Sequence, residues 1–226
     1  MARVLRHAGG AVTAVVVAID GPGGVGKSTV SRLVAEQIGA AHLDTGAFYR
    51  AAALAVLRTG ADPEDPAAVV AAVSGRRIDH DRGRTTLDGA DVSDAIRTDE
   101  VTAAVSAVSG HPDLRKRMVE AQQQWVNRRG NRAVVEGRDI GTVVFPEATL
   151  KIFLDADPAV RAARRSGETG TAASAVAEAL ARRDRLDSTR PNSPLAAADD
   201  AVHLDTTELS VDEVVARILA LLPDGL

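Results

Sequence analysis

The chain has 226 residues, of which 45% are hydrophobic, and a formal net charge of −4 at pH 7. This length favours one domain, or one domain with a sizeable insertion, and the negative charge argues against a general binder of nucleic acids. The lack of cysteine excludes a disulfide scaffold and a thiolate metal site, and no apolar run approaches the ~18 residues of a membrane span.

Residues 1–10 include Arg3, Arg6 and His7 and precede an apolar run, a pattern that superficially resembles a signal peptide. The apolar run, however, leads straight into a glycine-rich motif, and cleavage after it would destroy that motif. We therefore expect residues 1–10 to be a loose tail and the protein to be cytoplasmic. We expect neither a membrane nor a nucleic acid among its partners.

The apolar run from Val15 to Ile19 predicts a buried parallel strand, and residues 21–28 read G-P-G-G-V-G-K-S. This fits G-x-x-x-x-G-K-[ST], the phosphate-cradling P-loop, and the apolar spacing over 27–38 predicts the helix that follows it. Its glycines let successive N–H groups converge on phosphate oxygens, Lys27 adds a charge, and Ser28 is placed to ligate Mg²⁺. The alternative is a glycine-rich turn with a chance Lys-Ser pair, which the flanking strand and helix disfavour. The ATP-binding residues expected here are Gly21, Pro22, Gly23, Gly24, Val25, Gly26, Lys27, Ser28 and Thr29.

The next segment predicts a strand at 40–44, a helix from 45 to about 59, and a short helix to about 73 with Asp65 as its N-cap and Pro66 in its first turn. The pattern then changes to short strands at 76–80 and 84–87, followed by the hairpin signal Asp88-Gly89. We expect a small antiparallel sheet inserted into a chain of alternating strands and helices.

Strands and helices alternate again in the second half of the chain. A polar break at 166–171 is expected between two Arg-rich helices, the first of which is capped by Asp157. Helices between strands predict a parallel sheet in a three-layer α/β/α core, whose ligands bind outside the carboxyl ends of the strands. The other predicted helices are at about 98–108, 112–129 and 211–222, and the predicted strands are at 131–136, 149–154 and 201–204.

Polar clusters follow two of these strands, D-T-G-A-F-Y-R at 44–50 and E-G-R-D-I-G at 136–141, and a third lies in the Arg-rich run 182–190. Each has a plain structural alternative: Arg50 as a solvated helix residue, Arg138-Asp139 as a loop ion pair, and the run as a solvated helix end. Arginine is suited to bidentate phosphate recognition, and the first two clusters share the sheet edge of the P-loop. Together they indicate a second phosphorylated substrate.

Five stretches in this order resemble the motifs of bacterial cytidylate kinases, the CMP/dCMP kinases: G-P-G-G-V-G-K-S, L-D-T-G-A-F-Y-R, E-G-R-D-I-G-T-V-V-F-P, I-F-L-D-A and R-D-R-L-D-S-T-R. The resemblance covers roughly residues 13–222. It implies transfer of the γ-phosphoryl group of ATP to CMP or dCMP, with Mg²⁺, by a monomer. It also implies a P-loop core of 11–43 and 131–226 with a five-stranded parallel sheet, a monophosphate-binding region of 44–130 that includes the inserted sheet 76–92, and a lid at 166–172.

The resemblance also implies roles for single residues. Lys27, Arg138, Arg161 and Arg165 would be catalytic, and Tyr49, Arg50 and Arg138 would surround the CMP phosphate. Thr45, Arg115, Asp139 and Arg190 would face the cytosine, and Ser106, Arg183 and Asp187 the sugar. Two residues depart from the family pattern: Thr45 stands where serine is frequent, and Glu136 where aspartate is more usual.

Other functions remain open at this stage. Another small-molecule P-loop kinase (uridylate, adenylate or shikimate kinase) is the main alternative, and a P-loop ATPase switch is an alternative from a different class. Residues 150–155 mimic a Walker B strand, but we expect Asp155 to begin the turn that leads to the Asp157 cap.

Overall fold

A computed structural model describes residues 14–223 of the chain, and a five-stranded parallel sheet of order β2-β6-β1-β7-β8 lies at its centre. The tail expected at residues 1–10 lies outside the described residues. All five strands were predicted to within two residues at each end, and the parallel sheet is confirmed. The strands are β1 Val15–Asp20, β2 Ala41–Asp44, β6 Arg132–Gly137, β7 Leu150–Asp155 and β8 Val202–Asp205.

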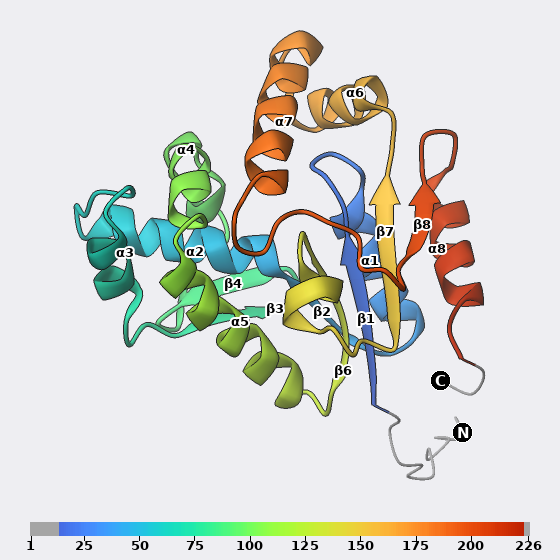
Figure 1. Cartoon of the computed structure of the whole chain (residues 1–226), viewed down its shortest axis with the longest axis horizontal. Coiled ribbons are helices and arrows are strands. Elements are labelled where there is room, and N and C mark those ends of the chain that lie inside the picture. The colour runs from blue at the N-terminus through green and yellow to red at the C-terminus, as the bar shows by residue number, and fades with distance from the viewer. Residues whose placement is uncertain (1–13, 224–226) are drawn as a thin grey trace, which may run out of the picture.

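Helices cover both faces of this sheet, so the three-layer core is also confirmed (Figure 1). Alternate residues of β1 point to opposite faces, as strand geometry requires. Val17 and Ile19 pack with α1 (Lys27–Gln37) and α8 (Val211–Ala220), whereas Ala18 packs with α2 (Thr45–Arg58) and α5 (Pro112–Asn127).

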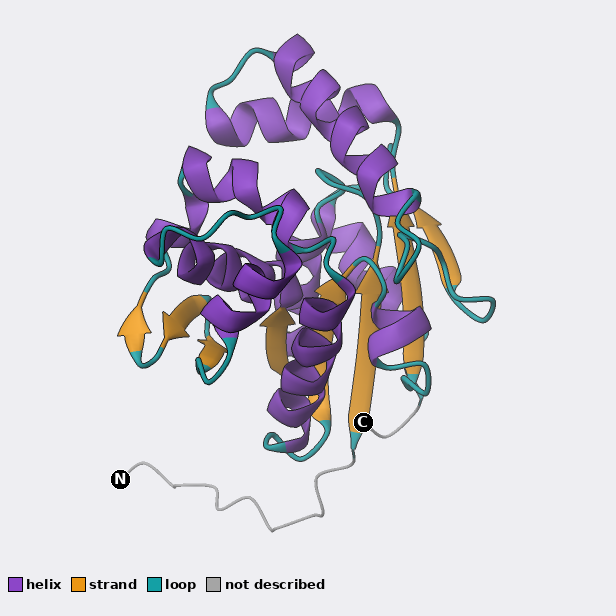
Figure 2. Cartoon of the chain, turned by 60° about the vertical axis from the view of Figure 1, so that its left-hand side comes forward, coloured by secondary structure: helices purple, strands orange, loops and turns teal. Residues whose placement is uncertain are grey.

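The inserted antiparallel sheet is present at one side of the molecule, apart from the main sheet (Figure 2). It contains β3 (Ile78–Asp81), β4 (Arg84–Leu87) and β5 (Ala90–Asp91). Asp88-Gly89 does turn the chain, with φ of 53° and 84°, but it joins β4 to β5, a strand that the sequence analysis missed. The remaining elements of this side are α3 (Pro66–Val73, capped by Asp65 as predicted), the 3₁₀ turn η1 (Ala95–Arg97) and α4 (Asp99–Val108).

Helices α6 (Pro158–Thr169) and α7 (Ala173–Ser188) lie beyond the carboxyl ends of the strands (Figure 1). The polar break expected at 166–171 is wrong for residues 166–169, which continue α6. Helix α6 ends at Gly170, whose φ of 69° is the left-handed conformation that glycine adopts at helix ends. The polar residues are therefore a solvated helix face, where Arg165 pairs with Glu168 at 2.7 Å. Within residues 14–223, no helix is both long and apolar enough to cross a membrane.

Trp125 of α5 anchors the inserted sheet to the helices. Its side chain is fully buried, its Nε1 donates to the His80 carbonyl at 2.9 Å, and the Arg129 guanidinium lies 3.6 Å from its ring centroid. Trp125→Ala should lower the free energy of unfolding by about 3–5 kcal/mol, because the cavity cannot be refilled. Urea unfolding followed by circular dichroism measures the change. Val202→Ala on the exposed strand β8 is the control, and a loss at Trp125 no larger than that of the control would contradict the packing.

Candidate active site

A cavity of about 350 Å³ lies at the carboxyl ends of the central strands, between the P-loop, α2, α4, α5 and α7. It is the place that the parallel sheet predicts for a ligand. Seventeen of the residues predicted for ATP or CMP line it: Gly23, Gly24, Gly26, Lys27, Ser28, Thr29, Thr45, Tyr49, Arg50, Ser106, Arg115, Arg138, Asp139, Arg165, Arg183, Asp187 and Arg190.

Four predicted residues do not line the cavity: Gly21, Pro22, Val25 and Arg161. Val25 is buried in the core under the loop. Gly21 has φ of 148°, and a Cβ there would lie 2.2 Å from the Leu154 carbonyl oxygen, so only glycine fits. The Gly21 and Pro22 carbonyls instead accept from Lys27 Nζ at 2.8 and 2.7 Å. Burial, and next the nearby Arg138, lower the pKa of the Lys27 ammonium, so its charged form is disfavoured in the empty site. An anion bound beside it would stabilise that charged form.

Glu136, which the sequence analysis placed in a polar cluster without giving it a role in the site, is a hydrogen-bond acceptor beside the P-loop helix. Its Oε2 accepts from Ser28 Oγ at 2.9 Å, and its Oε1 lies 3.2 Å from Ser31 Oγ and 3.1 Å from His42 Nε2. Residue 136 follows the apolar part of β6 and is in register with Ile19, one position before the end of β1. A charged residue at the end of a buried strand was the signal that could have identified it. Asp155 is the exposed last residue of β7 and does not line the cavity. The chain leaves the strand after it, and Asp157 caps the next helix as predicted.

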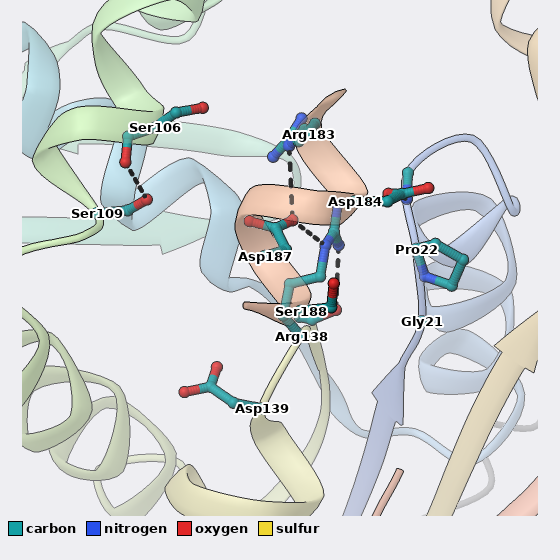
Figure 3. A network of polar contacts seen from close by, with 12 residues as sticks. Gly21, Pro22, Ser106, Ser109, Arg138, Asp139, Arg183, Asp184, Asp187 and Ser188 are labelled. Carbon is teal, nitrogen blue, oxygen red and sulfur yellow. Dashed lines mark hydrogen bonds and ion pairs between the residues drawn. The ribbon is translucent and has the colours of Figure 1, made fainter. Parts of the chain in front are cut away.

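Asp187 of α7 gathers three arginines on one side of the cavity. Figure 3 shows two of them, Arg138 and Arg183. Its carboxylate accepts from Arg138 Nε at 2.9 Å and Arg190 Nη2 at 2.7 Å, and lies 3.8 Å from Arg183 Nε. The alternative that Arg138 forms a loop ion pair with Asp139 is therefore wrong, because Arg138 pairs with Asp187. The interpretation of the Arg-rich run as a solvated helix end is wrong for Arg183, Asp187 and Arg190, which line the cavity, whereas Arg182 and Arg185 are exposed.

Asp139 pairs with Arg115 at 2.6 Å, and both side chains are buried. Arg115 also donates to the Ser109 carbonyl at 3.1 Å, and its guanidinium lies 5.1 Å from the Tyr49 ring centroid. Burial raises the pKa of the Tyr49 hydroxyl to about 12, so it stays protonated at neutral pH and can donate a hydrogen bond. Arg50, beside this group, donates to the Ile96 carbonyl and to Thr102 Oγ1.

Arg161 connects α6 and α7 to the P-loop. It pairs with Asp184 of α7 and donates to the Gly23 carbonyl at 3.1 Å. Asp184 in turn accepts from the Gly23 N–H at 3.2 Å, a contact that the sequence analysis missed because the charge run offered no way to rank its aspartates. Arg165, the next predicted arginine of α6, lies at the cavity.

The Arg115–Asp139 pair generates a stability prediction. Arg115→Met should lower the free energy of unfolding by about 3–5 kcal/mol, because it leaves Asp139 as an unpaired buried charge. Adding Asp139→Asn should recover much of the loss, which urea unfolding at pH 7 measures. Arg84→Met removes the exposed pair with Asp91 and should cost far less. Equal losses for Arg115→Met and Arg84→Met would contradict this account.

Three comparisons place this geometry among known proteins. A family model described as cytidylate kinase matches residues 17–224. A cytidylate kinase of Mycobacterium leprae is 51% identical over 93% of this chain and 96% of that protein, and one of Streptomyces avermitilis is 49% identical over 94% of each. The solved structure of an uncharacterised protein from Eubacterium ventriosum has a TM-score of 0.52 at 11% identity, covering 92% of this chain and 97% of that one, which is a likeness of fold alone.

Proposed function

The chain belongs to the cytidylate kinase family, and from this premise we propose how its cavity transfers the γ-phosphoryl group of ATP to CMP or dCMP. The observation that carries the proposal is that two anion-binding groups face one cavity. The P-loop and Lys27 form one of them, and would hold the ATP phosphates. Arg50 and Arg138, with the hydroxyl of Tyr49, form the other, and would hold the CMP phosphate.

The acceptor in this reaction is a phosphate oxygen, which is already anionic at pH 7. No general base is therefore needed, and the protein's task is to align the two phosphates and neutralise their charge. Lys27 on one side and Arg138 on the other supply positive charge, and Arg161 and Arg165 of α6 add to it from the ATP side. The predicted lid, residues 166–172, would exclude water, the competing acceptor, when it closes with the monophosphate-binding region 44–130.

Ser28 and Glu136 fit a magnesium ion. Both side chains offer hard oxygen ligands, which Mg²⁺ prefers. The Ser28 hydroxyl donates its hydrogen bond to Glu136, so the lone pairs of Ser28 Oγ are free for a cation. When bound, the ion would neutralise charge on the β- and γ-phosphate oxygens. The longer glutamate, in place of the more usual aspartate, spans Ser28, Ser31 and His42 together.

Cytosine would lie against Arg115, Asp139, Arg190 and Thr45, and the sugar against Ser106, Arg183 and Asp187. Ionised Asp139 only accepts hydrogen bonds, so it would pair with the cytosine amino group and repel the uracil carbonyl. This donor and acceptor pattern favours CMP over UMP. A P-loop ATPase switch would have no use for the arginines at Asp187, and ATP turnover measured with and without CMP separates it from a kinase. A cytoplasmic monomer remains our prediction from the sequence.

Lys27→Ala should lower kcat by about 10²–10³-fold and leave the protein folded, because the charge at the β- and γ-phosphates is lost. A coupled assay of ADP release with ATP and CMP measures kcat, and circular dichroism checks the fold. Lys116→Ala, at an exposed lysine of α5, is the matched control. Near-normal turnover of the Lys27 variant would refute the P-loop role.

Asp139→Asn should lower kcat/KM for CMP more than for UMP, because the amide can donate to the uracil carbonyl. A site built on hydrogen bonds can reject a mismatched analogue by up to ~10⁴-fold, so the difference in kcat/KM between CMP and UMP is large enough for a decrease to be measured. Steady-state kinetics with both substrates decide the matter. If both kcat/KM values fall in proportion, Asp139 only supports Arg115 and does not read the base.

A further inference from the structure

Asp20 is the last residue of β1 and immediately precedes the P-loop, yet its carboxylate is bonded to a different segment. Its Oδ1 accepts from the Ile140 N–H at 2.9 Å and its Oδ2 from the Gly141 N–H at 2.8 Å. The residue is 4% exposed, so water does not compete for these bonds. The two amides open the single π-helical turn η2 (Ile140–Val144), and the first N–H groups of a helical turn have no acceptor within it.

The segment that Asp20 holds is the one that carries Arg138 and Asp139. We propose that Asp20 is a positioning residue for the CMP side of the reaction, which fixes the backbone from which these two side chains reach the cavity. The inference rests on the proposed function, since it takes Arg138 and Asp139 as CMP-binding residues. Neither residue contacts Asp20 through a hydrogen bond from its own side chain, so the effect passes through the backbone of Ile140 and Gly141.

Close packing leaves this segment little room to rearrange. A Cβ added at Gly141 would lie 3.2 Å from Lys151 Cδ and 3.5 Å from Asp20 Oδ2. Asp139 itself is the residue that precedes the turn, with φ of −141° and ψ of 24°. Loss of the two acceptors would leave two buried N–H groups unpaired, and the segment would shift to recover partners.

Two charged side chains act on Asp20: Lys27 from α1 and Asp139 from the segment after β6. Lys151 of β7 packs beside Gly141, and its ammonium pairs with Asp200. Burial is the main cause that raises the pKa of Asp20, to about 6, and Asp139 raises it further, whereas the two N–H groups and Lys27 lower it. Asp20 is therefore ionised at pH 7. Below about pH 6 it takes up a proton, and one of its oxygens then carries a hydrogen in place of a free acceptor.

Asp20→Asn is the test, because asparagine keeps the shape but turns an NH₂ group toward one of the two N–H groups. KM for CMP should rise about tenfold with a fall in kcat, whereas KM for ATP should change by less than about twofold, although residue 20 adjoins the P-loop. Steady-state kinetics in which ATP and CMP are varied in turn measure both KM values and kcat. Asp199→Asn, which removes the same charge at an exposed position, should leave all three constants unchanged. Equal changes in both KM values, a change in ATP alone, or no change would overturn the proposal.

A second measurement uses the unaltered protein and keeps the proposal testable if Asp20→Asn does not fold. CMP binding measured by calorimetry should weaken more steeply from pH 7 to pH 5 than ADP binding, because Asp20 loses an acceptor in that range. The terminal phosphate of ADP takes up a proton in the same pH range as the phosphate of CMP. ADP is therefore a control for the effect of protonating the ligand itself. Parallel pH profiles for CMP and ADP would overturn the positioning role. A wild-type protein without CMP kinase activity would instead refute the proposed function.

Discussion

Repulsion among buried cations is the constraint that the rest of the site must satisfy. Burial is the largest cause that lowers the pKa of the Lys27 ammonium, and the nearby Arg138 and Arg183 lower it further. Four carboxylates oppose this charge, and each has a fixed place: Glu136 at Ser28, Asp187 among three arginines, Asp139 at Arg115 and Asp20 beneath the loop. The carboxylates balance part of the positive charge around the cavity. The cations can therefore stay close together and still attract anions.

The parallel sheet makes this balance possible. Strands β1, β2 and β6 end at one edge, so residues far apart in sequence, Asp20, Asp44 and Gly137, come to adjacent positions there. Residues of the inserted region and residues of α6 and α7 line the cavity as well. Its walls come from five stretches of chain (23–29, 44–50, 96–115, 136–139 and 165–190), and none of them could form the site alone.

The sequence was sufficient for the elements and for the set of residues around the cavity, because strand ends, caps and glycine motifs are local signals. Pairings were harder to predict. The chain order suggested Arg138 with Asp139, whereas α7 brings Asp187 to Arg138 across 49 positions. Glu136 and Asp184 were missed for the same reason, since their partners lie in the P-loop and its helix. The continuation of helix α6 through 166–169 was missed because polar residues occur both on solvated helix faces and in loops.

The chain contains one tryptophan, and the fold buries it in the core cluster that joins the inserted sheet to one face of the main sheet. Its indole is shielded from water, hydrogen-bonded to His80 and covered by Arg129. The intrinsic tryptophan emission of this protein is therefore a local signal, which reports the surroundings of α5 and the inserted sheet on one side of the molecule. A fluorescence unfolding curve would follow that side, whereas circular dichroism would follow the whole chain, so the two together show whether both halves unfold in one step.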